Sequence, residues 1–394
     1  MSTLTQMQDV QKRMLRLALV LCIVIQFAPL QSKAAVSLRV TPAILSLEAE
    51  PGATGEQPIA ISNEGTEAVE IVTGVEPYQG ATGMYSAVDW IRVEPATFTL
   101  NAGESREAMV QIEVPDDLDA GGRYALVTFT SGGGGGDEGS GASVAAKLGA
   151  AILLVVDGKG DLTESAELAG FGPVLEPDGR VGFRALLSNS GNVHLRPSGG
   201  VEILGADGVP YGSLEIPEER TVLPGNEALL SAVGSLPVDE NATYTASAEI
   251  HFGEDGVATG EVSFAPTVDL SIASVSVCEN LDRGPTLTAT LQNDGGLGLT
   301  PNTRFVVLSA GGNLIGDASA LQTNPVWGGT TAEMAADFSE RLVTGDYVLA
   351  VQVQLVSPSG NGESIVPPLE YEQPFSIGGL GGNAAPLCET SESG

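Results

Sequence analysis

Ile59-Ala-Ile-Ser-Asn63-Glu-Gly65 is an apolar strand that runs into an Asn-x-Gly turn, and the pattern occurs three times in the chain. The other two copies are Ala185-Leu-Leu-Ser-Asn189-Ser-Gly191 and Ala289-Thr-Leu-Gln-Asn293-Asp-Gly295. Asn and Gly both tolerate the positive φ that a tight reversal between strands requires. The recurrence indicates an internal structural repeat.

Two further landmarks follow each copy in the same order. A second glycine-marked turn comes first, at Asn101-Ala-Gly103, Leu223-Pro-Gly225 and Trp327-Gly-Gly329. A tyrosine then opens an alternating strand; the three are Tyr124, Tyr244 and Tyr347. In Greek-key sandwiches a tyrosine near the start of strand F can pack inward and bond its hydroxyl to nearby backbone. Simple filling of the core is the alternative interpretation of these tyrosines.

The landmarks predict an all-β chain of three tandem immunoglobulin-like β-sandwiches after a cleaved signal peptide. The 51 glycines and 23 prolines fit many turns between short strands. Thr330 to Arg341 is the nearest candidate for a helix, but its place in the repeat predicts a strand. The expected limits are 1–34 for the signal peptide, 35–156, 166–265 and 266–377 for the sandwiches, 157–165 for a linker, and 378–394 for a flexible acidic tail.

The N-terminus has the features of a secretion signal. Lys12, Arg13 and Arg16 precede the apolar run Leu17 to Phe27, and Ser32-Lys33-Ala34 offers a cleavage site. The apolar run is shorter than the roughly 20 residues that a membrane-spanning helix needs. We therefore expect an exported protein, periplasmic or extracellular, with an uncleaved signal anchor as the alternative.

The charge of the chain restricts its partners. Of the 394 residues 17 are basic and 50 are acidic. Cleavage after residue 34 removes four basic residues and one acidic residue, which leaves 13 basic and 49 acidic residues and a net charge of −36. Such a surface repels nucleic acids and anionic lipid. We expect envelope or extracellular proteins as partners, and no insertion into the membrane after cleavage.

Two cysteines remain after cleavage, Cys278 and Cys388. An oxidising compartment favours their pairing as a disulfide, which would hold the C-terminal tail to the start of the third sandwich. Two unpaired thiols are the alternative.

The first predicted sandwich resembles the first domain of periplasmic pilus-assembly chaperones and of WxL-protein-interacting modules. The residues that carry the resemblance are Ala35-Val-Ser-Leu-Arg39-Val-Thr-Pro42, Trp90-Ile-Arg-Val-Glu-Pro95, Phe98-Thr-Leu-Asn-Ala-Gly103-Glu-Ser-Arg106 and the strand Val110 to Val114. The third sandwich is similar, more loosely, to adhesion-type modules of bacterial secreted proteins.

The chaperone resemblance implies a mode of binding. In that family two basic side chains anchor the carboxylate of a subunit, and the last strand of the domain completes the subunit's sheet. Arg39 and Lys147 are the residues that could serve as this anchor, and ordinary surface charges are the alternative. The stretch Ser143 to Val156 departs from the family, because it lacks a clean alternation of bulky residues.

The sequence offers little for catalysis. The only histidines are His194 and His251, and no Gly-x-Ser-x-Gly, His-Glu-x-x-His or Cys-x-x-Cys motif is present. No catalytic residues, metal ligands or cofactor are therefore predicted. Calcium stays open, because Asp116, Asp117 and Asp119 form an acidic cluster.

The resulting hypothesis is an exported, non-catalytic binding or scaffold protein of the envelope that assists surface-fibre assembly by β-strand addition. One alternative is an adhesin or a module that binds wall polysaccharide. Another is a hydrolase with an unrecognised site.

Overall fold

The computed structural model describes residues 36–131, 146–280, 283–355, 367–378 and 383–388. Regular structure in these residues is strand, apart from three short 3₁₀ turns at Tyr78–Gly80, Gly83–Tyr85 and Val88–Trp90. The predicted all-β fold class is confirmed. Thr330–Asp337 is a strand, as its place in the repeat predicts. The predicted signal peptide lies outside the described residues.

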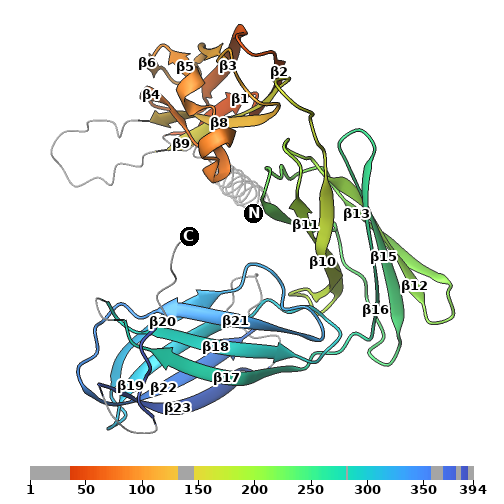
Figure 1. Cartoon of the computed structure of the whole chain (residues 1–394), viewed down its shortest axis with the longest axis vertical. Coiled ribbons are helices and arrows are strands. Elements are labelled where there is room, and N and C mark those ends of the chain that lie inside the picture. The colour runs from red at the N-terminus through yellow and green to blue at the C-terminus, as the bar shows by residue number, and fades with distance from the viewer. Residues whose placement is uncertain (1–35, 132–145, 281–282, 356–366, 379–382, 389–394) are drawn as a thin grey trace, which may run out of the picture. The chain divides into compact units, whose positions relative to one another are not determined.

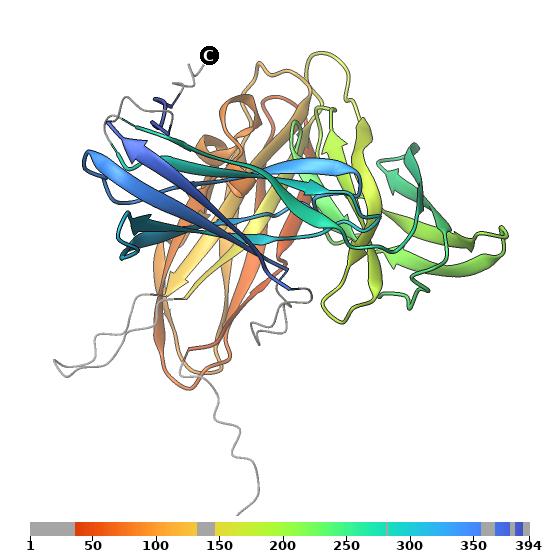
Figure 2. The same ribbon diagram turned by 90° about the horizontal axis from the view of Figure 1, so that it is seen from below.

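The chain divides into two compact units. Unit 1 contains the described residues up to Leu118 together with Arg123–Val156, and unit 2 contains Asp119–Gly122 together with the described residues from Asp157 onward. Figure 1 labels most of the strands, and Figure 2 shows the same sheets after a 90° turn.

Unit 1 is a sandwich of two sheets. The first sheet has the order β1-β3-β7-β5, with bounds Leu38–Thr41, Thr54–Asn63, Ser105–Glu113 and Ile91–Glu94. The second has the order β2-β9-β8-β4-β6, with bounds Ile44–Ala49, Lys147–Val156, Gly121–Ser131, Val69–Glu76 and Thr97–Leu100. Alternate residues of both sheets form one apolar core, which contains Ile59, Val110, Phe129 and Ile152.

Unit 2 contains two further pairs of sheets. In the first pair, the sheet β10-β11-β14 and the sheet β13-β12-β15-β16 enclose a core built around Phe183, Tyr244 and Phe264. Their bounds, in the order β10 to β16, are Ala166–Leu175, Val181–Asn189, Ser198–Gly205, Pro210–Ile216, Glu227–Ser231, Tyr244–Phe252 and Gly256–Phe264.

In the second pair, the sheet β17-β18-β21 and the sheet β20-β19-β22-β23 enclose a core that includes Phe305, Leu349 and Phe375. Their bounds, in the order β17 to β23, are Leu270–Cys278, Thr286–Asn293, Asn302–Ser309, Leu314–Leu321, Thr330–Asp337, Gly345–Gln354 and Leu369–Ile377. We call the pairs of unit 2 the second and third sandwiches. Because they form one compact unit, three separately folding domains stay a prediction.

The repeated asparagine has the same contacts in all three sandwiches. In the second, the buried Asn189 amide donates to the carbonyl oxygens of Val193 and Val222, both at 2.9 Å, and its Oδ1 accepts from the Gly191 N–H at 2.9 Å. Its main-chain oxygen accepts from the Gly225 N–H at 2.8 Å. The two turns predicted from sequence are therefore joined by the asparagine itself.

The equivalent residues repeat this arrangement. The Asn63 amide donates to the oxygens of Glu67 and Leu100, at 2.7 and 3.2 Å. The Asn293 amide donates to those of Leu297 and Val326, at 2.7 and 2.8 Å. A buried side-chain amide that donates to two main-chain carbonyl oxygens stabilises a chain reversal, here called the asparagine corner, where no regular strand pairing is present.

The tyrosines at the third landmark are all buried. The Tyr347 hydroxyl donates to the Val343 oxygen at 2.9 Å, and the Tyr244 hydroxyl accepts from the Asp239 N–H at 2.9 Å. Both bonds reach backbone a few residues upstream, as in a tyrosine corner. Tyr124 is fully buried in β8.

Candidate functional site

One edge of strand β9 in unit 1 is paired along only part of its length. Strand β2 pairs with it in parallel, but only from Ala151, opposite Ile44, to Val156, opposite Ala49. The ladder begins with the Ala151 N–H, which donates to the Ala43 oxygen at 2.9 Å. Residues Lys147–Ala150 therefore extend beyond the end of β2.

The main-chain groups of Lys147 and Gly149 face the side from which β2 is missing. Because the Ala151 N–H points toward β2, the N–H and C=O groups of every second residue along β9 share that direction. In the described part of the chain, no main-chain group bonds to Lys147 or Gly149 on this side. An open edge of about four residues results, and open edges can accept a further strand.

Apolar side chains lie next to this open edge. Ala150 is fully buried in the core, and Leu148, two residues earlier on the same face, is half-buried. Strand β1, which precedes β2, pairs with β3 in the opposite sheet. Its Leu38 and Val40 are half-buried against the core. Half-buried apolar side chains of β1 and β9 thus lie beside the open part of the edge.

Arg39 and Lys147 lie on opposite faces of unit 1. Arg39 points out of the β1 sheet, since Leu38 and Val40 face the core, and its Nε bonds Glu64 at 2.7 Å. Lys147 points out of the β9 sheet, and its Nζ bonds Glu76 Oε2 at 2.7 Å. Each cation already has a carboxylate partner. Their joint role as a carboxylate anchor stays a prediction.

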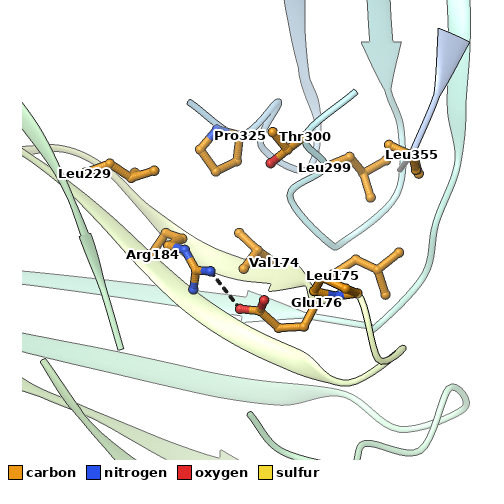
Figure 3. A pocket seen from close by; sticks show the side chains of 10 residues that line it. Val174, Leu175, Glu176, Arg184, Leu229, Leu299, Thr300, Pro325 and Leu355 are labelled. Carbon is orange, nitrogen blue, oxygen red and sulfur yellow. Dashed lines mark ion pairs between the residues drawn. The ribbon is translucent and has the colours of Figure 1, made fainter. Parts of the chain in front are cut away.

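Unit 2 has a pocket of about 220 Å³ between the second and third sandwiches. Figure 3 shows Val174, Leu175, Glu176 and Arg184 on one side and residues of the third sandwich on the other. The Arg184 guanidinium bonds Glu176 Oε1 at 2.9 Å, and both side chains are mostly buried. The remaining lining is largely apolar: Pro177, Leu229, Leu299, Thr300, Pro325 and Leu355. Because its only charges neutralise each other, the pocket suits an uncharged apolar group.

The walls of this pocket are held by direct contacts between the two sandwiches. The Gly298 N–H donates to the Pro173 oxygen at 2.8 Å, and the Leu175 N–H donates to the Gly298 oxygen at 3.1 Å. The Trp327 ring lies against Gly170 and Gly172, where a Cβ would come within 2.8 and 3.3 Å of the indole. The absence of side chains on these two residues lets the ring approach the backbone.

The predicted cysteines lie together. The structure joins Cys278 and Cys388 in a disulfide, with their Cα atoms 4.8 Å apart. Asn383–Cys388, part of the tail expected to be flexible, is bonded to the third sandwich through main-chain groups.

The two histidines of the chain lie in different surroundings. Burial, together with the Arg196 charge, lowers the pKa of His194, and Glu164 opposes that shift. His251 is exposed and lies 3.0 Å from Glu249. Among the described residues no group of three or more His, Cys, Asp or Glu side chains could hold a metal ion. Asp116, Asp117 and Asp119 do not form such a group, and calcium binding stays the alternative that the sequence leaves open.

No helix in the described ranges has the length and apolar character needed to span a bilayer.

No family model matches the chain, and no curated protein does. Several solved structures are similar in part. The Escherichia coli chaperone DraB is 10% identical, with 58% of this chain and 96% of that chain covered and a TM-score of 0.33. The complex of the Salmonella enterica SafA pilin with the SafB chaperone is 11% identical, with 58% of this chain and 96% of that chain covered and a TM-score of 0.32. The CsuC–CsuE chaperone–tip adhesion subunit complex of Acinetobacter baumannii is 13% identical, with 49% of this chain and 89% of that chain covered and a TM-score of 0.26.

These structures contain pilus-assembly chaperones, the class that the first sandwich resembles in sequence. At this identity and these TM-scores, the function of the chain has to be argued from its own residues.

Proposed function

We propose that the chain is an exported, non-catalytic binding protein that holds an extended segment of a partner protein by β-strand addition to β9. In the cell envelope, such a protein would assist the assembly of surface fibres. The open edge at Lys147–Ala150 is the observation that carries this proposal.

Strand addition needs free main-chain groups and a place for alternate side chains. Lys147 and Gly149 supply the main-chain groups, and the half-buried Leu38, Val40 and Leu148 supply an apolar surface beside them. An incoming strand would extend the sheet beyond β2 and cover this part of the core. The burial of apolar area adds to the main-chain hydrogen bonds.

The partner segment should be neutral or basic. The chain has a net charge of −33, so an acidic segment would be repelled over long range. The Lys147 side chain is already paired with Glu76. In this proposal Lys147 contributes its backbone, and its charge is not needed as an anchor.

Peptide selection with two substitutions at one position tests the proposal. Peptides are selected from a random dodecapeptide phage library on the full secreted chain, and their affinities are measured for Lys147→Pro and Lys147→Gln. Proline removes the outward N–H at the first residue of the strand, where it is tolerated. Glutamine keeps the N–H but removes the charge.

We expect Lys147→Pro to weaken peptide binding by about tenfold, which corresponds to the loss of one main-chain hydrogen bond, and Lys147→Gln to leave it nearly unchanged. A larger loss of affinity in Lys147→Gln than in Lys147→Pro would indicate that the peptide is recognised through the charge. Equal binding by both variants and the wild type would place the peptide elsewhere. Either result would contradict strand addition at β9.

A further inference from the structure

The C-terminal segment Asn383–Cys388, here called the strap, spans the two sheets of the third sandwich. It bonds to β23, an edge strand of the four-stranded sheet, and to the residue that follows β17, an edge strand of the three-stranded sheet. The strap therefore lies along an open side of the sandwich that its two sheets leave uncovered.

The bonds to β23 have the pattern of a parallel strand. The Ser376 N–H donates to the Asn383 oxygen at 2.8 Å, and the Ala385 N–H donates to the Ser376 oxygen at 2.9 Å. Ser376 and Ala384 thus form a parallel bridge.

The same pattern occurs at the end of β17. The Glu279 N–H donates to the Pro386 oxygen at 2.7 Å, and the Cys388 N–H donates to the Glu279 oxygen at 2.9 Å. Glu279 and Leu387 form the second parallel bridge. Four main-chain bonds, two to β23 and two to the residue after β17, make the strap an added strand, although it belongs to neither sheet.

Few side chains fix the strap in place. Ala385 packs against the core of the third sandwich, but Leu387 is 59% exposed. The covalent link is the disulfide between Cys388 and Cys278, and both cysteines are only half-buried. A dissolved thiol can therefore reach the bond.

We infer that the strap occupies a strand-binding site on the third sandwich and leaves this site when its disulfide is reduced. Reduction of Cys278–Cys388 frees the strap, and the main-chain groups of Ser376 and Glu279 then take an extended segment of the same kind. The segment that fits is the strap of a second copy of this chain, because its backbone and its terminal cysteine already match the site.

The redox step requires a dithiol as reductant. One thiolate of the dithiol attacks the disulfide and displaces one cysteine of the chain as its thiolate. The second thiolate of the dithiol then displaces the other cysteine. The chain gains two electrons and two protons as two thiols, and the reductant leaves as a disulfide.

Hydrogen exchange of the full mature chain tests the release. In the oxidised chain the amides of Ser376, Glu279 and Cys388 should exchange slowly. After treatment with dithiothreitol they should exchange at least about tenfold faster, because the hydrogen bonds that protect them open more often. Unchanged protection after complete reduction would overturn the inference, because the strap would then stay bound without its disulfide.

The Cys388→Ser variant tests strand binding separately. In its mature form Cys278 is the single thiol. A peptide with the sequence of residues 383–388, activated at its cysteine as a thiopyridyl disulfide, stands for the strap of a second copy. Cys278 attacks the peptide sulfur, and the thiopyridyl group leaves as the thione.

We expect the strap peptide to label Cys278 at least about tenfold faster than a scrambled peptide that keeps the terminal cysteine, because binding raises the local concentration of the reactive group. Equal rates would show thiol reactivity without strand recognition and would overturn the inference. The assay probes the third sandwich, so equal labelling rates would not count against the proposed function, which rests on the open edge of β9.

Discussion

The N–H of Gly103 donates to the main-chain oxygen of Asn63 at 2.8 Å, across 40 residues of sequence. Gly225 bonds Asn189 and Gly329 bonds Asn293 in the same way, also at 2.8 Å. The two glycine-marked turns of each repeat are thus held against one buried asparagine. This contact explains why the landmarks recur together, since each asparagine needs both turns to satisfy its polar groups.

The asparagine corner predicts a large loss of stability on truncation. Asn293→Ala should lower the free energy of unfolding by about 3 kcal/mol, because it leaves the buried oxygens of Leu297 and Val326 without donors. The exposed Asn313 is a matched control, and Asn313→Ala should change stability by less than about 0.5 kcal/mol. Urea unfolding checks both values. Equal small losses would show that the corner is held by other contacts.

The tyrosine corner predicts a smaller effect. Tyr347→Phe keeps the ring in the core but removes the hydroxyl that donates to Val343. The expected loss is about 1 kcal/mol. Tyr371, which is 43% exposed, provides the control substitution Tyr371→Phe, with almost no expected loss. Thermal unfolding that fails to separate the two variants would speak for simple core filling.

Trp327 should couple the second and third sandwiches. Its ring covers Gly170 and Gly172, so Trp327→Ala should cost about 2 kcal/mol, below the range for a fully buried tryptophan because this ring is half-buried. We also expect the unfolding transition of unit 2 to broaden or split in calorimetry. Trp327→Phe, which keeps an aromatic ring, is the control. A single unchanged transition in the alanine variant would contradict the coupling.

His194 should make unit 2 sensitive to mild acid. Since burial lowers its pKa, the folded state binds fewer protons than the unfolded state. The stability that follows from this difference is present above the ordinary histidine pKa of about 6.5 and is lost as the pH falls through the folded pKa. Urea unfolding at pH 7.5 and 5.5 should therefore show a smaller loss in His194→Gln than in the wild type. An identical loss would assign the acid sensitivity to other groups.

The repeated landmarks allowed the all-β fold to be predicted because their information is local. An Asn-x-Gly turn, a glycine turn and a strand-opening tyrosine each appear within a few residues. The strand ends at Val156, Phe264 and Ile377 likewise follow from nearby turn residues.

The open edge of β9 could not be read from the sequence in the same way. It depends on where β2 begins to pair, and β2 and β9 are about 100 residues apart. Arg39 and Lys147 illustrate the same limit. Their positions in strands were predicted, but the sheet that each strand joins decides which face its side chains occupy. The pocket of unit 2 also depends on packing, because two glycines and a distant tryptophan meet only in the folded chain.

Hydrogen exchange along β9 tests the account most directly. In the free chain, the amides of Lys147 and Gly149 should exchange rapidly, while those of Ala151 and Leu153, which face β2, should be protected. A peptide selected on the chain should slow the exchange of Lys147 and Gly149 and leave Ala151 and Leu153 unchanged. Protection of all four amides in the free chain, or no slowing at Lys147 and Gly149 with peptide bound, would contradict strand addition at this edge.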